Sequence, residues 1–204
     1  MKILAFDTCL DKTYITIADD LNVIESKIIL SDSTNYHSAY LISSIAELLK
    51  NNNLEPSDID LIATDIGPGS FTGIRACTTV ARVLAQQLNK KAVGISSLEI
   101  LSKIQGGDDL VCLDARKNKA YVYDGKILGA VELDKVDEMV RNRKVITDNS
   151  LLERISQNAS ETISYQQKEY NLGEILAKLA INKEETDWQI LKPLYIQPPP
   201  VFGR

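Results

Sequence analysis

A glycine-rich segment, Asp65–Arg75 (DIGPGSFTGIR), is the part of the sequence whose residue types and spacing come closest to a binding motif. Its three glycines, Gly67, Gly69 and Gly73, lie between an apolar run typical of a strand and a helical pattern. The Gly67-Pro68-Gly69 step predicts a tight turn with access to positive φ. Such a turn at a helix N-terminus presents backbone N–H groups, which bind anions.

This turn departs from the two common phosphate-binding patterns. No Lys-Ser or Lys-Thr pair follows the glycines, as a P-loop requires. The spacing also differs from the dinucleotide fingerprint, and the segment does not follow the first strand of the chain. Two interpretations therefore remain: an anion site, or glycines that only permit a sharp turn and close packing. Ser70 or Thr72 is expected to cap the helix, and Gly73 is expected to let its first turn pack closely on a neighbouring element.

Histidine and cysteine limit the catalytic chemistry. The single histidine, His37, excludes a two-histidine metal site within the chain, and a Ser-His-Asp triad would have to use it. His37 lies near the start of an amphipathic helical pattern, which favours a helix-start or interface residue over a catalytic base. Cys9, Cys77 and Cys112 are too widely spaced for a zinc motif, so three reduced, mostly buried thiols are expected. The sequence therefore predicts no catalytic residue and no metal site.

The composition limits the class of protein. With 204 residues, of which 44% are hydrophobic, the chain can form one large domain or two small lobes. No apolar run approaches the roughly 18 to 20 residues of a membrane span, and the first residues lack the features of a signal peptide, so a cytoplasmic location is expected. The net charge of −5 argues against direct nucleic-acid binding, which normally uses a basic face. The one basic stretch, Arg141–Lys144, is interpreted as a solvated face.

The first half of the chain, residues 1–105, is predicted to be an α/β lobe with a mixed sheet. Three adjoining strands at its start indicate a meander, and helices alternate with strands after it. The expected strands are 2–6, 13–18, 23–30, 59–65 and 91–95, and the expected helices are 36–50, 71–88 and 97–104.

A polar linker with paired glycines, Gln105–Asp109, precedes a smaller predicted α/β lobe over residues 106–204. Its expected strands are 110–113, 120–123 and 127–133, and its expected helices are 151–155 and 172–181. A proline-rich tail follows Pro193 and is not helical. Arg116 and Lys117 either line a cleft between the lobes or occupy an ordinary exposed hairpin turn.

Five segments, in the same order along the chain, resemble the motifs of one protein family, TsaB, which is also called YeaZ. The turn GPGSFTGIR is similar to that family's signature. The other four are Asp7-Thr8-Cys9 after the first strand, His37-Ser38 ahead of a helix with Leu41, Asp114–Tyr121 (DARKNKAY) and Pro193–Ile196 (PLYI). Cys9 stands where serine is usual, Ala120 where valine is usual and Gln197 where arginine is common, and no role is assigned to Cys9 or Gln197.

The resemblance implies the actin-like ATPase fold of sugar kinases, Hsp70 and ribonuclease H, with two α/β lobes of which the second is reduced. It implies a non-catalytic subunit that supports the threonylcarbamoyltransferase TsaD, together with TsaE, in forming N6-threonylcarbamoyladenosine next to the anticodon of tRNA. The expected partners are TsaD and TsaE, with a homodimer when the chain is alone and tRNA contacted only through the complex. The chain alone is expected to bind no cofactor, and any ATP or ADP would lie at the complex with TsaD and TsaE.

The residues agree with a non-catalytic role. In folds of this type the end of the first strand grips phosphate, but the segment DTCLDKT after Asp7 lacks the glycine that lets the backbone close around it. The second half also lacks a glycine-paired adenine motif after a late strand. A cleft between the lobes is expected to include Asp7, Thr8, Asp114 and Arg116.

The helices at 37–50 and 71–88 are the candidate partner surface, because paired helices with apolar stripes form a bundle when two chains meet. The predicted interface consists of His37, Leu41, Ile45, Ala76, Thr79, Val80, Val83 and Gln87. The alternative is that both stripes face their own sheet.

Three other functions stay open: a free-standing small-molecule kinase of the same fold, a metallopeptidase, against which the lone histidine argues, and a scaffold unrelated to tRNA.

Overall fold

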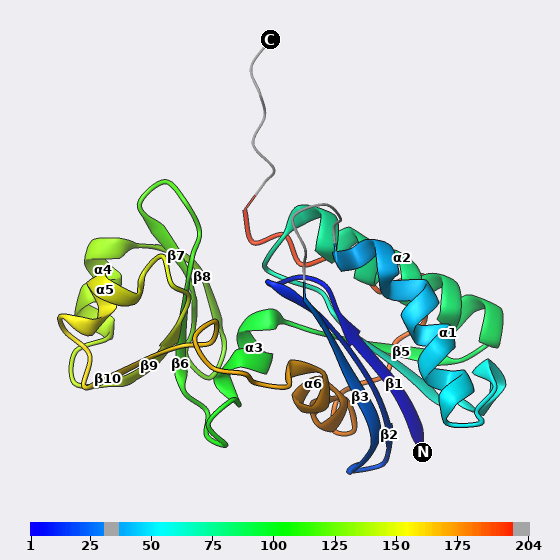
Figure 1. Cartoon of the computed structure of the whole chain (residues 1–204). Coiled ribbons are helices and arrows are strands. Elements are labelled where there is room, and N and C mark those ends of the chain that lie inside the picture. The colour runs from blue at the N-terminus through cyan, green and yellow to red at the C-terminus, as the bar shows by residue number, and fades with distance from the viewer. Residues whose placement is uncertain (31–36, 198–204) are drawn as a thin grey trace. The chain divides into compact units, whose positions relative to one another are not determined.

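The computed structural model describes residues 1–30 and 37–197, with the backbone alone at residues 37 and 38. Two compact units make up the chain and are described separately (Figure 1). Unit 1 comprises residues 1–100 and 171–193, and unit 2 comprises residues 101–170 and the stretch from Leu194. Both contain a mixed five-stranded sheet with helices, as expected for an α/β protein.

The sheet of unit 1 has the strand order β3-β2-β1-β4-β5. Its strands are β1 (Lys2–Asp7), β2 (Lys12–Asp19), β3 (Asn22–Leu30), β4 (Leu61–Asp65) and β5 (Lys91–Ile95). Strand β1 pairs antiparallel with β2 and parallel with β4, which confirms the predicted meander and the mixed sheet. The central place of β1 explains its apolar sequence, because five of its six residues are buried.

Helices cover both faces of this sheet. Helices α1 (Leu41–Asn51) and α2 (Phe71–Leu88) lie on one face, and α6 (Leu172–Ala180) lies on the other (Figure 1). Short helical segments are α3 (Ser97–Ser102) and the 3-10 turns η1 (His37–Tyr40) and η2 (Pro56–Asp58). The predicted bounds of α2 are confirmed, whereas α1 begins only at residue 41, because a 3-10 turn precedes it.

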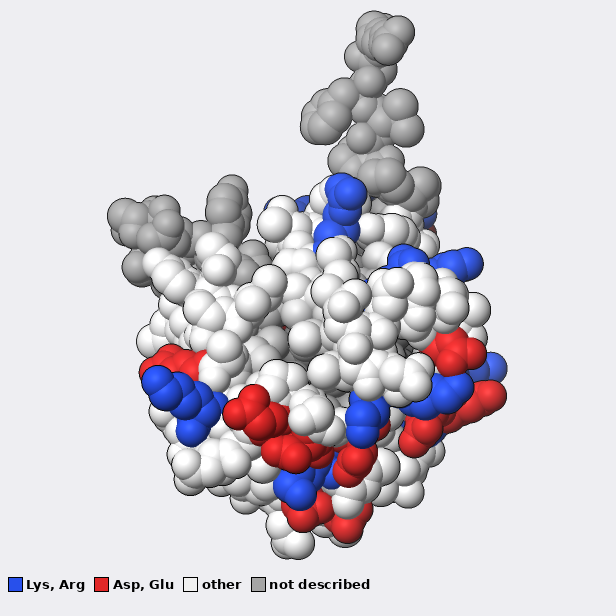
Figure 2. Space-filling view, turned by 90° about the vertical axis from the view of Figure 1, so that its right-hand side faces the viewer, with Lys and Arg blue, Asp and Glu red and all other residues white. Residues whose placement is uncertain are grey.

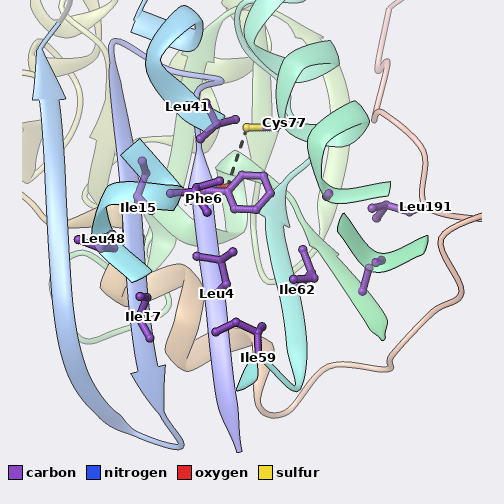
Figure 3. Close-up of a cluster of buried hydrophobic side chains, with 14 of the residues drawn as sticks. Leu4, Phe6, Ile15, Ile17, Leu41, Leu48, Ile59, Ile62, Cys77 and Leu191 are labelled. Carbon is purple, nitrogen blue, oxygen red and sulfur yellow. Dashed lines mark hydrogen bonds between the residues drawn. The ribbon is translucent and has the colours of Figure 1, made fainter. Parts of the chain in front are cut away.

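The core of unit 1 forms between the sheet and helices α1 and α2. Leu4 and Phe6 of β1 project to this face, where Leu41 and Leu48 of α1 and Cys77 of α2 meet them (Figure 3). The alternation of β1 explains the arrangement, because every second side chain of a strand points to the same face. This core holds α2 directly above the end of β1.

Ser70 caps the N-terminus of α2, as predicted, because its Oγ accepts the N–H of Gly73 at 3.3 Å. Replacement Ser70→Ala is expected to lower the free energy of unfolding by about 1 kcal/mol, measured by urea denaturation. Ser43→Ala in α1 is the matched control, since the exposed Ser43 hydroxyl donates to the carbonyl of Tyr40 and satisfies no helix N–H. Equal losses in the two variants would contradict the capping role.

Helix α6 belongs with unit 1, which differs from the predicted division into residues 1–105 and 106–204. Its apolar side packs on β1 and β2, and its N-cap Asn171 bonds Ser26 of β3. The chain then runs along β5, where Thr186 and Ala92 exchange backbone hydrogen bonds of 2.8 and 2.9 Å. Local composition does not reveal that a late segment of the chain packs on strands near its start.

The sheet of unit 2 has the strand order β10-β9-β6-β7-β8. Its strands are β6 (Leu110–Asp114), β7 (Lys119–Tyr123), β8 (Ile127–Glu132), β9 (Lys144–Thr147) and β10 (Glu161–Ser164). Helices α4 (Leu133–Met139) and α5 (Leu152–Ser156) supply part of its core. The sequence prediction omitted β9, β10 and α4, each of which is at most seven residues long.

The basic stretch 141–144 is not simply a solvated face. The Arg143 guanidinium binds Asp124 through two hydrogen bonds of 2.9 and 2.7 Å, and Lys144 opens strand β9. A second arginine, Arg154 of α5, binds Asp134 and Asp137 of α4.

Among the described helices of both units, none has the length and apolar character needed to cross a membrane.

Candidate functional site

The glycine-rich turn connects the end of β4 to α2 and is held from both sides. Gly67 has a φ of 102°, its N–H donates to Asp65 Oδ1 at 2.7 Å, and its carbonyl accepts the N–H of Ser97. The positive φ explains why glycine stands there. The turn is thereby fixed to the ends of β4 and β5.

The same turn packs directly on the backbone after β1. A Cβ placed at Gly73 would lie 1.8 Å from the carbonyl oxygen of Thr8, and one at Gly69 would lie 2.2 Å from that of Cys9. The N–H of Ser70 donates to the Cys9 carbonyl at 2.6 Å, and the Thr8 hydroxyl donates to the Gly73 carbonyl at 2.9 Å. The predicted close packing of Gly73 is confirmed. The N–H groups of Gly67, Ser70 and Gly73 are bonded within the chain, which favours the packing interpretation over an open anion site.

Two carboxyl groups lie sealed beneath this turn. Asp7 ends β1 and Asp65 ends β4, the neighbouring parallel strand, and both are 0% exposed. Asp7 Oδ1 accepts the N–H of Cys9 at 2.6 Å, and Asp65 Oδ1 also accepts the Ser97 hydroxyl at 2.8 Å. Burial raises the pKa of Asp7 well above its usual range, and the nearby Asp65 charge raises it further. Burial likewise raises the pKa of Asp65 to about 7.

Both cysteines of unit 1 border the carboxyl pair. Cys9 follows β1 and Cys77 projects from the second turn of α2, and both thiols are buried, as predicted. Burial raises the pKa of the Cys9 thiol well above its usual range, helped by Cys77 and Asp65. The Cys9 thiol is therefore a poor nucleophile, because the thiolate is the reactive form.

The four residues predicted to line a cleft between the lobes fall in different units. Asp7 and Thr8 are buried in unit 1. Asp114 and Arg116 belong to the hairpin between β6 and β7 in unit 2, where the Arg116 side chain is 88% exposed. Arg116 has a positive φ, and its N–H donates to Asp114 Oδ1. The exposed hairpin turn is thus observed, and a shared cleft stays a prediction.

A groove between α1 and α2 is the clearest candidate for an interaction surface. Its volume is about 220 Å³, and it is lined by Ile42, Ile45, Thr79, Val80, Val83 and Leu84. Ile42 is 68% exposed and Val83 50% exposed, which is unusual for aliphatic side chains at neighbouring positions on two helices. Figure 2 looks onto the side of the molecule that carries these helices and shows a broad area without charged side chains.

Four of the predicted interface residues line this groove: Ile45, Thr79, Val80 and Val83. Leu41 instead packs in the core at 1% exposure, because it points to the sheet. Ala76 and Gln87 lie on α2 outside the groove lining, and the side chain of His37 lies outside the described residues.

The sequence prediction missed Ile42 and Leu84 as groove residues. Both belong to the apolar stripes of these helices, for which contact with a partner or with the sheet was left open, but neither was named as an interface residue. The signal was present in α1, since Leu41, Ile45, Leu48 and Leu49 already complete the buried stripe. Ile42 widens that stripe beyond what one face of the sheet can cover.

Known proteins resemble this chain in sequence. A protein named tRNA threonylcarbamoyladenosine biosynthesis protein TsaB from Buchnera aphidicola subsp. Baizongia pistaciae is 34% identical over 102 residues, 50% of this chain and 45% of the relative. The Bacillus subtilis protein of the same name is 32% identical over 124 residues, 59% of this chain and 53% of the relative. The family model described as TsaD, tRNA N6-adenosine threonylcarbamoyltransferase, matches residues 24–180. The chain belongs to this TsaD/TsaB family.

The fold is shared with solved structures. YeaZ from Pseudomonas aeruginosa has a TM-score of 0.72 at 19% identity, covering 95% of this chain and 99% of that chain. An uncharacterized protein similar to the peptidase YeaZ has a TM-score of 0.77 at 19% identity, covering 96% of this chain and 99% of that chain. The resemblance to the TsaB (YeaZ) family and the actin-like fold are confirmed. The sequence matches themselves span about half the length of the two TsaB relatives above.

Proposed function

We propose that this chain is a non-catalytic subunit in the formation of N6-threonylcarbamoyladenosine in tRNA. In this proposal it binds a TsaD-type threonylcarbamoyltransferase through the groove between α1 and α2. The observation that carries the proposal is the exposed apolar pair Ile42 and Val83, held on two rigid helices in a chain of this family. Association would remove these side chains from water.

The occupant of the groove is argued from the family match. Residues 24–180, which match the TsaD family model, include both α1 and α2. A TsaD protein therefore carries counterparts of these two helices. Two such faces, each made of two helices with an apolar groove, can pack as a four-helix bundle. The same geometry supports a homodimer of this chain when the partner is absent.

A catalytic role for the chain alone is disfavoured by the end of β1. In this fold that position would have to meet the phosphates of a bound nucleotide, but Asp7 and Thr8 are 0% exposed. The turn that could cradle phosphate is closed on Thr8 and Cys9 instead. In the proposal, any ATP or ADP belongs to the assembly with TsaD and TsaE, and tRNA is bound by another subunit, in keeping with the net charge of −5.

Reconstitution of the reaction from purified proteins tests whether this chain is a required but non-catalytic subunit. Formation of threonylcarbamoyladenosine by TsaD and TsaE, supplied with threonylcarbamoyl-adenylate and tRNA, is expected to need this chain, which alone forms no product. Calorimetric titration of the chain alone with Mg-ATP is expected to give no saturable heat. Saturable ATP binding together with full product formation in the absence of the chain would overturn the proposal and favour a free-standing small-molecule kinase.

A further inference from the structure

Three side chains that bind transition metals meet in the core of unit 1. Cys9 and Cys77 are 68 positions apart in the sequence, but the packing of α2 on the end of β1 brings them together. One carboxylate oxygen of Asp7 and the Sγ atoms of Cys9 and Cys77 all lie within 4.8 Å of one another. Figure 3 shows Cys77 pointing from α2 toward the carbonyl of Phe6, the residue before Asp7 in β1.

A second observation concerns the oxygen atoms at this position. Asp7 Oδ2 and Asp65 Oδ2 are buried and accept no N–H group of the described residues. The Asp7 carboxyl hydrogen-bonds instead to the Asp65 carboxyl and to Cys9. No lysine or arginine among the described residues forms an ion pair with either carboxylate. Buried carboxylates are normally paired, hydrogen-bonded or bound to a metal. The Asp7 carboxyl hydrogen-bonds within the cluster, so a metal ion bound there would take the place of those bonds at the point where the two thiols converge.

The surrounding backbone is suited to a metal-bound thiolate. The N–H of Thr8 donates to Cys77 Sγ at 3.0 Å. Hydrogen bonds of this kind orient metal ligands and tune them. The Cys9 N–H donates to Asp7 Oδ1 at 2.6 Å and orients the carboxyl group in the same way.

We propose that Asp7, Cys9 and Cys77 form a binding site for a divalent transition-metal ion of the Zn²⁺ class. Two sulfur ligands select Zn²⁺ or Co²⁺ over Mg²⁺ and Ca²⁺, which prefer oxygen alone. Binding replaces the two S–H bonds with two metal–sulfur bonds and the O–H bond of a protonated Asp7 with a metal–oxygen bond, and the protons leave to solvent. The three ligand residues are buried, so the role of the ion is structural: it joins α2 to the end of β1.

This inference departs from the sequence prediction that the chain has no metal site. The wide spacing of the cysteines argued against a zinc motif, and the fold removes that argument for Cys9 and Cys77. It is independent of the proposed function, because neither partner binding nor tRNA modification requires the ion. The ion would stabilise α2, whose outer surface forms the groove.

Cobalt binding tests the site on the full chain. The chain is treated with a chelator, and Co²⁺ is added while thiolate-to-cobalt charge-transfer absorption is recorded, with Zn²⁺ then used as competitor. One equivalent of Co²⁺ with sulfur ligation is expected, displaced by Zn²⁺. Replacement Cys9→Ser or Cys77→Ser is expected to weaken affinity at least about 10-fold and to reduce the charge-transfer band.

Two controls keep the test decisive. Cys112→Ser changes a buried thiol of unit 2 outside the cluster and is expected to leave Co²⁺ binding unchanged. Serine is the usual residue at position 9 in the family that the sequence resembles, so Cys9→Ser is expected to fold, as circular dichroism would check. Absence of a sulfur-to-cobalt band in the wild-type chain, or equal affinity in the folded Cys9→Ser variant, would overturn the proposal.

Discussion

Replacement Val83→Asp is expected to weaken binding of this chain to its TsaD-type partner strongly while leaving its own fold intact. Val83 is half exposed and lines the groove with Ile42, so a carboxylate is tolerated in the free chain. In the complex the same carboxylate would be buried among apolar side chains without a partner, which is costly. A loss of about 3 kcal/mol corresponds to a roughly 100-fold weaker affinity. Isothermal titration calorimetry with the TsaD of the same organism measures it.

Leu128→Asp is the matched control for this variant. Leu128 lies on β8 of unit 2, is 40% exposed and is also aliphatic, but it is outside the groove. It is expected to bind the partner with wild-type affinity. If both variants lost affinity equally, general destabilisation would be the cause, and if Val83→Asp bound at full strength, the groove would not be the interface.

Replacement Gly73→Ala is expected to lower the free energy of unfolding by about 3 kcal/mol, because overpacking of a rigid contact is destabilising. The added Cβ would lie 1.8 Å from the carbonyl oxygen of Thr8, which is backbone and cannot rotate away. Alanine is the better helix former by about 1 kcal/mol, so a net loss reports the clash itself. Urea denaturation followed by circular dichroism gives the value.

Gly107→Ala provides the reference for this measurement. Gly107 lies in unit 2, where a Cβ would meet nothing closer than 3.7 Å. Its replacement is expected to change the free energy of unfolding by less than about 1 kcal/mol. A Gly73→Ala variant as stable as Gly107→Ala would contradict the packing of the glycine-rich turn on the end of β1.

Local patterns predicted much of the fold. The bounds of α2 and β5 follow from helical periodicity and from a short apolar run, and the structure confirms both. Ser70 was recognisable as a cap because a capping residue lies next to the helix that it caps. Such features depend on residues that are close together in the sequence, so local sequence patterns are enough to predict them.

Features that depend on distant contacts could not be predicted in this way. The return of α6 to unit 1 depends on packing against β1 and β2, about 160 to 170 residues earlier in the sequence. The meeting of Cys9 with Cys77 depends on the closeness of two backbones, of which Gly73 was the one local indication. For the groove, periodicity found both helices but did not separate the buried Leu41 from the exposed Ile42, which is adjacent to it.

Size-exclusion chromatography with light scattering, on this chain with and without the TsaD of the same organism, tests the central claim most directly. The account predicts a homodimer of the chain alone that is replaced by a stable one-to-one complex when TsaD is added. Elution of the two proteins as separate species at concentrations well above the low-micromolar range of specific complexes would contradict it.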